Sequence, residues 1–243
     1  MENKKDELTV QMSIIIAGIL ISGSILLGFT WIKSNNGKTN KQADEPKKAE
    51  LAPISKEDRI MGDLNAKISV IMYEDFQCPW CGKFHSEAEK ELRDKYLPES
   101  KVNLVYRDFA FLGTFIKPPK YSIKKDESIK SAEAARCAGD QGKFWDYHDY
   151  LFDHQNGENA GGFSNANLKS FAQTLGLNTI SFNLCLDNGK YTKAVEEQKS
   201  NGVAIGVTGT PKGFILKNGE IVDTIDGYLP TDTVTAKIDK VLK

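Results

Sequence analysis

The sequence lacks several features that would point to other kinds of protein. Its 243 residues carry a formal net charge of -1, and lysines are scattered along the chain, so it has no electrostatic footprint for nucleic acid. No internal repeat is present, which excludes a repeat architecture. Cysteine is scarce, with only four in the chain. Of these, Cys137 and Cys185 stand alone in separate segments, where a zinc ribbon would offer a second C-x-x-C.

The remaining two cysteines form the most informative motif, Cys78-Pro79-Trp80-Cys81. It follows an apolar extended run, Ile68 to Tyr73, and opens a helix-like run, Cys78 to Tyr96. Two thiols at i and i+3 meet at a helix start, where unpaired N-H groups and the helix dipole stabilise a thiolate. Pro79 suits the first helical turn because it has no N-H to lose. The strand-to-helix placement favours a redox dithiol, with half of a zinc site or a purely structural pair as alternatives.

The N-terminal segment predicts a membrane anchor. Between Glu7 and Lys33 there is no ionisable side chain, and Met12 to Ile32 as a helix would span roughly 30 Å, which matches a bilayer core. No small-residue cleavage pattern follows, and no cysteine is placed to accept a lipid. We therefore expect an uncleaved signal anchor at residues 12–32, after a short tail at residues 1–11.

Lysine counts and cysteine use disagree about the orientation of this anchor. More lysines follow the span than precede it, which by the positive-inside rule would place the C-terminal side in the cytoplasm. An even cysteine count with isolated pairs instead suits an oxidising compartment, and a long folded domain can translocate despite flanking charge. We expect a single-pass protein of the cell membrane with an extracytoplasmic domain. Residues 33–53, which contain little apolar sequence, are expected to form a flexible linker.

The rest of the chain, residues 54–243, predicts one α/β domain. Strands are expected at Ile68–Tyr73 and Val102–Arg107, and a hairpin is expected where Phe214–Leu216 and Ile221–Ile225 flank Asn218-Gly219. The expected helices are Cys78–Tyr96, Ser128–Gln155, Asn165–Leu175, Tyr191–Val203 and Thr231–Leu242. This order is that of a thioredoxin-type core with a helical insertion at about residues 126–204.

Several motifs, in this same order, resemble the DsbA-like thiol:disulfide oxidoreductases. They are Gly62-Asp63-Leu64-Asn65-Ala66, Asp75-Phe76-Gln77 before the C-x-x-C, Ala134-Ala135-Arg136-Cys137-Ala138, Gln141-Gly142-Lys143-Phe144-Trp145, Tyr147-His148-Asp149 and Gly206-Val207-Thr208-Gly209-Thr210-Pro211. The resemblance extends from Leu51 to the C-terminus. It implies a thioredoxin fold with an inserted helical domain and an enzyme that exchanges disulfides with proteins.

The resemblance also implies roles for individual residues. Cys78 matches the exposed nucleophile and Cys81 the buried resolving thiol, which exchange through a mixed disulfide with the substrate. Pro211 matches a cis-proline beside the dithiol, although Thr-Pro after a Gly-rich turn would otherwise be taken for an ordinary turn. The expected substrate-binding residues are Pro79, Trp80, Thr210 and Pro211.

The chain departs from the family pattern in three places. Family members usually carry a buried Glu six residues before the nucleophile, and this chain has Met72 there. Glu74 lies two residues on and therefore on the same strand face, so it is expected to act as the catalytic proton acceptor, with a solvated strand-end acid as the alternative. Lys212-Gly213 follows the proline where larger apolar residues are usual. Phe111 to Lys125 is a longer loop, expected at the surface.

The remaining candidates receive structural interpretations. The resemblance implies a structural disulfide between Cys137 and Cys185, with two buried free thiols as the alternative. His148 and His154 are six residues apart and do not share a helical face, so no metal site is expected. His85 is expected to be an ordinary exposed histidine. Five apolar and aromatic residues are expected in the core: Phe144, Trp145, Tyr150, Leu151 and Phe152.

Together these observations predict a membrane-anchored, extracytoplasmic thiol:disulfide oxidoreductase without a cofactor. It would donate the Cys78-Cys81 disulfide to reduced exported polypeptides. The resemblance implies reoxidation by a quinone-linked membrane oxidase of the DsbB or VKOR type. Three alternatives stay open: a reductase or isomerase of the same fold, a tethered peptide-binding chaperone-like module without redox turnover, and a metal-binding domain built on the two cysteines.

Overall fold

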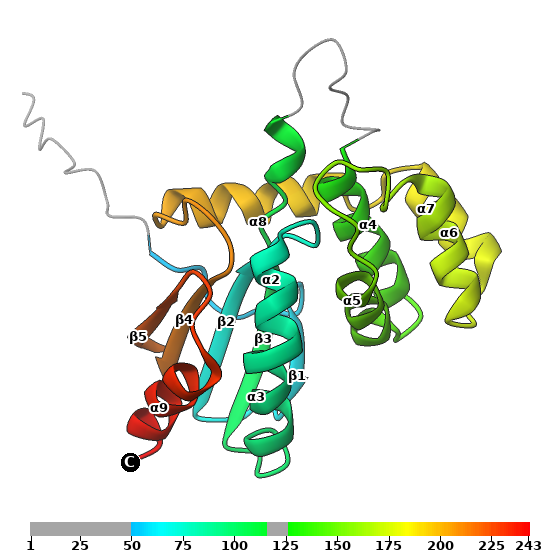
Figure 1. Ribbon diagram of the computed structural model, residues 1–243. Helices are drawn as coiled ribbons and strands as arrows, with labels where there is room; N and C mark the ends of the chain where they lie inside the picture. Colours follow the sequence, from blue (N-terminus) through cyan, green and yellow to red (C-terminus); the bar gives the residue numbers. More distant parts are fainter. Residues whose placement is uncertain (1–49, 116–125) are drawn as a thin grey trace, which may run out of the picture. The chain divides into compact units, whose positions relative to one another are not determined.

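The central element of the fold is a five-stranded sheet with the strand order β1-β3-β2-β4-β5 (Figure 1). The computed structural model describes residues 50–115 and 126–243, which fall within one compact unit. The strands are β1 (Arg59–Gly62), β2 (Ile68–Glu74), β3 (Val102–Asp108), β4 (Lys212–Lys217) and β5 (Glu220–Asp226). Strands β2 and β3 run parallel, and the other neighbouring pairs are antiparallel. Every residue of β2 and β3 is buried, as expected for strands covered on both faces.

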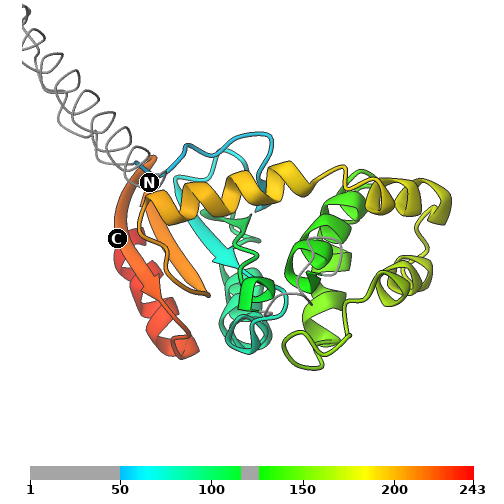
Figure 2. The same cartoon turned by 90° about the horizontal axis from the view of Figure 1, so that it is seen from above.

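Helices cover both faces of this sheet (Figures 1 and 2). On one face, α2 (Pro79–Phe84), the π-helix η1 (His85–Glu89) and α3 (Lys90–Lys95) follow one another, and α9 (Thr231–Leu242) lies beside them. Met72, Phe84 and Ile238 belong to the apolar cluster on this side. The opposite face packs near the end of α8 (Thr192–Ala204), where Gly202 allows a close approach because an added Cβ would lie 2.9 Å from the Phe109 ring.

The helical insertion forms another apolar cluster beside the sheet. It consists of α4 (Glu127–Gly139), α5 (Phe144–Asp153), α6 (Asn165–Thr174) and α7 (Thr179–Asp187), from which α8 returns to the sheet (Figure 2). The side chains of Asp126, Ser164 and Asn178 accept hydrogen bonds from backbone N-H groups at the starts of α4, α6 and α7. Such caps satisfy N-H groups that have no partner inside a helix. Tyr147, Leu168 and Phe182 are fully buried in this cluster.

The predicted thioredoxin-type core with inserted helices is confirmed, and the expected helix over Ser128–Gln155 is wrong in detail. The chain turns between α4 and α5, where Gly142 adopts φ 71°, a conformation that favours glycine. Helix α7 and the short edge strand β1 were not expected. The Asn218-Gly219 turn joins β4 and β5, with φ 54° and 87°.

Two further expectations concern segments that the structure describes in part or not at all. Within the described part of the loop from Phe111, residues Leu112–Phe115 form a short 3-10 helix (η2) and Leu112 is buried, so this part is not a solvated loop. The reason is that Leu112 packs into the cluster of the helical insertion. The expected anchor at Met12–Ile32 lies outside the described residues. Within those residues, no helix has the length and apolarity needed to cross a bilayer.

Candidate active site

The C-x-x-C dithiol lies at the N-terminal end of α2. Cys78 is the N-cap residue, and its carbonyl accepts hydrogen bonds from the N-H groups of Cys81 at 3.0 Å and Gly82 at 3.1 Å. Both cysteines are free thiols. Cys78 is only 5% exposed and Cys81 is 0% exposed, so the implied exposed nucleophile is largely covered. The cover comes partly from the loop before β4, since Cys78 Sγ lies 3.4 Å from the Thr210 carbonyl oxygen.

The surroundings of the two thiols separate their acidities. A hydrogen bond with Cys81 is the main effect that lowers the pKa of Cys78, and it outweighs burial, so that this pKa falls to about 7. The Thr210 side chain and the N-H groups of Cys81 and Trp80 lower it further. Burial, followed by the hydrogen bond with Cys78, raises the pKa of Cys81 well above its usual value. At neutral pH the thiolate therefore resides on Cys78, which fits its predicted role as the nucleophile of the pair.

The pH dependence of alkylation tests this assignment. Because the pKa of Cys78 is lowered to about 7, the reduced protein is expected to react with iodoacetamide at one thiol, with a rate that rises through pH 7. Reactivity should be lost below that pH, as the thiolate is protonated. The measurement is the alkylation rate against pH, with the modified cysteine identified by mass spectrometry. Reaction at Cys81 first, or a midpoint near the ordinary cysteine value of about 8.5, would contradict it.

A buried carboxylate fixes the loop that precedes the dithiol. Asp75 is 1% exposed, and it accepts hydrogen bonds from the backbone N-H groups of Gln77 at 2.9 Å, Phe111 at 2.9 Å and Leu112 at 3.0 Å. Its own carbonyl accepts from the N-H of Cys78 at 2.9 Å. Asp75 thus connects the loop after β2 with the loop after β3, and sets the position at which α2 begins.

The helical insertion also holds this loop. The amide group of Gln155, which follows α5, donates hydrogen bonds to the carbonyls of Phe76 at 2.7 Å and Cys78 at 3.0 Å. The Gln77 amide donates to Ser128 Oγ at 2.7 Å, and Gln77 Oε1 accepts from the N-H of Asn159. Sequence reasoning missed these contacts because the partners lie about 50 to 80 residues apart.

The four expected substrate-binding residues surround the mouth of the dithiol. The Thr210-Pro211 peptide bond is cis. Pro79 and Trp80 are exposed, Trp80 at 56%, and the Trp80 ring lies 5.8 Å from the Tyr228 ring. Thr210 Oγ1, in contrast, is buried. Their role in substrate binding stays a prediction.

Glu74 is buried at the end of β2, on the same strand face as Met72. It is 1% exposed, so it is not a solvated strand-end acid. Two of the departures from the family pattern are neighbours, because Met72 pairs with Gly213 across β2 and β4. An added Cβ at Gly213 would lie 2.6 Å from Met72 Sδ. The methionine side chain therefore occupies the space that a larger residue would need at position 213.

Burial is the largest effect on the Glu74 carboxyl and raises its pKa well above the ordinary value. The nearby charges of Glu89 and Cys78 raise it further, while Arg93 lowers it. A carboxyl group with a raised pKa, whose charge acts on both thiols, can give a proton to the leaving Cys81 thiolate and, as a carboxylate, take it back when Cys81 next attacks. This arrangement fits the predicted role of Glu74 in proton transfer, which remains a prediction.

Glu89 and Arg93, whose charges act on Glu74, belong to a group that we call the histidine-carboxylate cluster. It comprises His85, Glu89, Arg93, His148 and Asp149. One ligand atom from each of the four members other than Arg93 lies within 4.8 Å of the others. The expectation of an exposed His85 is wrong, since its side chain is 12% exposed and stacks on Phe152. The i, i+4 spacing of His85 and Glu89 places them on one helical face. His148 and Asp149 of α5 lie about 60 residues further along the chain, and no sequence pattern predicts that they meet the first pair.

The cluster offers donors that Zn²⁺ accepts in other proteins, but it already contains a cation. Histidine nitrogen and carboxylate oxygen are common zinc ligands. Here Arg93 pairs with Glu89, donates to Asp149 at 2.8 Å, and lies 3.4 Å from His148 Nδ1. The guanidinium group therefore balances the two carboxylates. His148 and His154 do not meet, and His154 stacks on Tyr150 instead.

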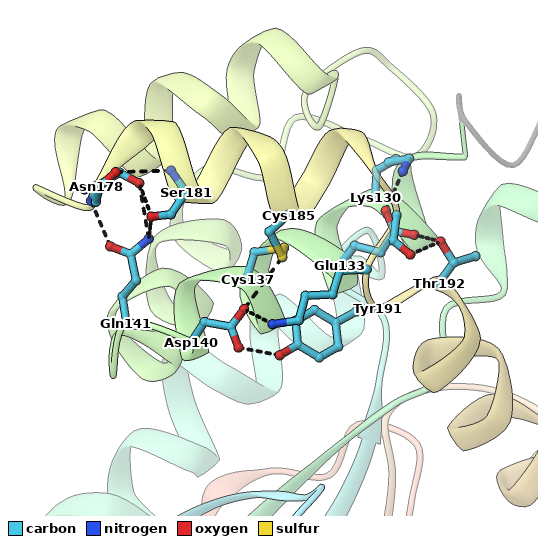
Figure 3. Close-up of a disulfide and its surroundings, with 12 residues drawn as sticks. Lys130, Glu133, Cys137, Asp140, Gln141, Asn178, Ser181, Cys185, Tyr191 and Thr192 are labelled. Atoms are coloured by element: carbon cyan, nitrogen blue, oxygen red, sulfur yellow. Dashed lines mark hydrogen bonds and ion pairs between the residues drawn. A yellow bond between two sulfur atoms is a disulfide. The ribbon is translucent and has the colours of Figure 1, made fainter.

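The other two cysteines are joined in a disulfide, which is the pairing that the resemblance implied. Cys137 of α4 and Cys185 of α7 are 48 residues apart in sequence, with a Cα–Cα distance of 5.9 Å (Figure 3). Asp140 lies beside the bond and accepts hydrogen bonds from Lys190 at 2.8 Å and from the Tyr191 hydroxyl (Figure 3). The disulfide therefore joins two helices of the insertion, on different elements from the C-x-x-C.

Loss of this disulfide is expected to affect stability and not exchange chemistry. The Cys137→Ser/Cys185→Ser variant should lower the free energy of unfolding by about 2–4 kcal/mol, because the unfolded chain is no longer constrained by a long closed loop. Urea unfolding of both proteins measures this difference. Disulfide exchange at Cys78 should proceed at the parental rate. Loss of exchange at unchanged stability would instead indicate a redox role for this pair.

The fold and the site together define a class of protein. A thioredoxin-type sheet carries a C-x-x-C dithiol at a helix start, beside a cis-proline and an inserted helical group. The family model described as Thioredoxin matches residues 55–240, and the chain belongs to this family.

Individual relatives refine this comparison. The Na(+)/H(+) antiporter NhaA 1 of Salinispora arenicola is 30% identical over 166 residues, which are 68% of this chain and 22% of the antiporter. A Rickettsia conorii protein named "Putative protein-disulfide oxidoreductase" is 27% identical over 192 residues, 78% of this chain and 62% of the relative. The chain thus spans about a fifth of the antiporter's length and less than two thirds of the Rickettsia protein's.

A solved structure gives the same picture of the fold. The crystal structure of Wolbachia pipientis alpha-DsbA1 aligns with a TM-score of 0.67 at 23% identity, covering 80% of this chain and 96% of that chain. At this identity the likeness bears on the fold, and the expected DsbA-like fold is confirmed.

Proposed function

We propose that this chain is an extracytoplasmic thiol:disulfide oxidoreductase that introduces disulfides into exported polypeptides. The observation that carries the proposal is that the pKa values of the two C-x-x-C thiols are shifted in opposite directions. Cys78 has a pKa of about 7 beside the Thr210-Pro211 loop, and Cys81 is fully buried with a raised pKa. A low-pKa nucleophile with a shielded second thiol forms and resolves mixed disulfides. The name of the Rickettsia relative supports this chemistry.

The reaction proceeds in two exchanges. A substrate thiolate attacks Cys78 Sγ, the Cys78–Cys81 bond breaks, and Cys81 leaves with the electron pair and takes a proton. A second substrate thiolate then attacks the substrate sulfur of the mixed disulfide and releases Cys78 as a thiolate. The substrate dithiol loses two electrons, and the enzyme disulfide gains two. Trp80 and the Thr210-Pro211 backbone would hold the substrate peptide at the mouth of the site.

The direction of exchange depends on how strongly the Cys78 thiolate is stabilised. Interactions that lower the pKa of Cys78 stabilise the reduced enzyme and make the disulfide a stronger oxidant, but a pKa of about 7 is also that of thioredoxin, so the reduction potential decides the direction. Equilibration with glutathione tests this, and a donor of disulfides is expected to have a reduction potential between about −180 and −120 mV. A value near −270 mV, typical of thioredoxin, would instead indicate a reductase. A site that binds peptides but fails to exchange disulfides would indicate the chaperone-like module.

The cellular setting completes the proposal. Residues 12–32 would anchor the chain in the cell membrane, residues 33–53 would link the anchor to the domain, and a quinone-linked membrane oxidase of the DsbB or VKOR type would reoxidise Cys78 and Cys81. The Cys137–Cys185 disulfide supports an oxidising compartment, because disulfides persist there and are rare in the cytosol.

The location has a direct test. A reporter that is active only in the cytoplasm, fused after Lys243, is expected to be inactive, because the domain is proposed to lie on the outer side of the membrane. A reporter that requires export should be active at the same fusion point. Protease added to intact spheroplasts should digest the domain. Either an active cytoplasmic reporter or complete protease resistance of the domain would contradict the proposed location.

A further inference from the structure

The histidine-carboxylate cluster takes no part in the proposed disulfide exchange, and its members come from two parts of the fold. His85 and Glu89 are the first and last residues of the π-helix η1, which follows directly after the dithiol helix α2. Such turns are rare and are frequent at functional sites. His148 and Asp149 belong to α5 of the helical insertion. The cluster thus brings two imidazoles and two carboxylates together where the insertion meets the helical run that begins at the dithiol.

The distances within the cluster fit ligands that surround one metal ion. Ligands of a tetrahedral zinc ion lie roughly 3.3 Å from one another, because each is about 2.0 Å from the metal. His85 Nδ1 is buried and makes no hydrogen bond among the described residues. It lies 3.5 Å from Glu89 Oε2 and 4.0 Å from Asp149 Oδ1. His148 Nδ1 lies 2.8 Å from the same Asp149 oxygen, so small side-chain rotations would bring these atoms to the tetrahedral spacing.

Arg93 is the cation already present, and it engages only the outer oxygen of each carboxylate. Its guanidinium group pairs with Glu89 Oε1 and donates to Asp149 Oδ2 at 2.8 Å. The oxygens that face the histidines are Glu89 Oε2 and Asp149 Oδ1. Outer hydrogen bonds of this kind orient the ligating carboxylates of metal sites. One guanidinium against two carboxylates still leaves one negative charge when both imidazoles are neutral, and this charge attracts a divalent cation.

The donor atoms select zinc among the common biological cations. Ca²⁺ and Mg²⁺ bind oxygen ligands, whereas Zn²⁺ binds histidine nitrogen together with carboxylate oxygen. Phe152 packs against both imidazoles, with ring centroids 5.1 Å from His85 and 4.9 Å from His148. Packing of this kind holds the rings in place and limits the access of water to a metal. Four protein ligands leave no open position, which is the arrangement of a structural site.

We propose that the histidine-carboxylate cluster is a structural zinc site, in which His85, Glu89, His148 and Asp149 bind one Zn²⁺. Both Nδ1 atoms must be unprotonated to bind the ion, so zinc replaces the hydrogen bond between His148 and Asp149. The Asp149 side chain is 38% exposed and gives zinc a route from solvent. The bound ion would join the helical insertion to the helical run that begins at the dithiol.

Zinc binding by the oxidised protein tests the proposal. The Cys78–Cys81 disulfide prevents both sulfurs from binding metal, and the protein is used without an affinity tag. After equilibration with Zn²⁺ and gel filtration, plasma mass spectrometry should find one zinc per chain. X-ray absorption of this sample should show nitrogen and oxygen ligands at about 2.0–2.2 Å, and no sulfur at about 2.3 Å. Neither measurement depends on the folding of a variant.

Two matched pairs of variants identify the ligands. Asp149→Asn should weaken zinc binding by at least about 100-fold, because losing a ligand costs more than the about 10–100-fold of losing an outer partner. Asp146→Asn makes the same change one turn earlier in α5, at an exposed side chain, and should leave the affinity unchanged. His85→Gln should weaken binding in the same way, whereas His154→Gln, outside the cluster, should not. Competition with a chelator measures each affinity, and circular dichroism shows whether each variant is folded.

The stability of the parent protein tests the structural role. Zinc that binds only the folded state should raise the midpoint of thermal unfolding, and this rise should be absent in Asp149→Asn. Bound zinc without such a rise would contradict the structural role.

Three results would overturn the site itself. They are an oxidised parent protein that retains no zinc, sulfur among the ligands of the bound ion, and an affinity that is unchanged in both Asp149→Asn and His85→Gln. None of these measurements follows disulfide exchange, so their outcomes are independent of the proposed enzyme activity.

Discussion

A Cys81→Ser variant is expected to accumulate covalent adducts with exported cysteine-containing proteins, and dithiothreitol should release them. Cys78 retains its position at the start of α2 and its lowered pKa is supported by several groups besides Cys81, including the Thr210 side chain. The variant can therefore still form the mixed disulfide, but no second thiol is present to resolve it. Non-reducing gels of membranes, followed by mass spectrometry of the trapped species, measure the result.

The Cys78→Ser variant provides the matched control for this experiment. It should trap no adducts, because the remaining Cys81 thiol is 0% exposed and has a raised pKa. If adducts formed through Cys81 alone, the roles of the two cysteines would be reversed. If neither variant trapped adducts, the peptide-binding module would be favoured over the enzyme.

The Glu74→Gln variant is expected to have the second-largest effect. It should slow the attack of Cys81 on a Cys78 mixed disulfide by about 100-fold, at the lower end of what acid-base catalysis contributes, and should affect the first attack at Cys78 much less. The reason is that only the Cys81 thiol, with its raised pKa, needs a partner to accept its proton. Stopped-flow measurement of the two steps separates them.

The stability of the Glu74→Gln variant gives an internal check. A buried acid with a raised pKa costs stability as the pH rises above its unfolded value, so removing it should not lower the free energy of unfolding at neutral pH. A second variant adds Met72→Glu, which restores a carboxyl at the family's position on the same strand face. Recovery of the rate in this double variant is expected. A rate equal to that of the parent in Glu74→Gln alone would assign the proton transfer to another group.

The sequence was sufficient to predict the parts of the site that depend on neighbouring residues. The C-x-x-C motif between a strand and a helix, and the Asn218-Gly219 hairpin, are local patterns whose physical causes act within a few residues. The expected helix over Ser128–Gln155 failed for the same reason, because composition alone does not show where Gly142 permits a turn. Strand β1 was not predicted because its four residues are too few to show the alternation of apolar and polar residues that indicates a strand.

The contacts that support the site could not be predicted in this way. His85 was expected to be exposed because its own segment shows only a helical histidine. The features that bury it are α5 and Phe152, which approach it only after the chain has folded around the insertion. The same holds for Gly213, which is explained by Met72 on the neighbouring strand. The burial and the contacts of such residues come from segments that are distant in sequence. They can be assigned only when the packing and strand register of those segments are known.

The hydrogen bonds from Gln155 and Asn159 to the loop before Cys78 have a consequence for how this protein could be divided. Both donors belong to the loop between α5 and α6 of the helical insertion, whereas the loop that they hold belongs to the sheet domain. Excising the insertion to obtain a minimal redox module would therefore remove the donors to the Phe76 carbonyl and to Gln77 Oε1, and one of the three donors to the Cys78 carbonyl. In this protein the insertion and the active site therefore form one structural unit. Grafting the C-x-x-C helix alone onto another protein would leave behind the hydrogen bonds that hold the loop before Cys78.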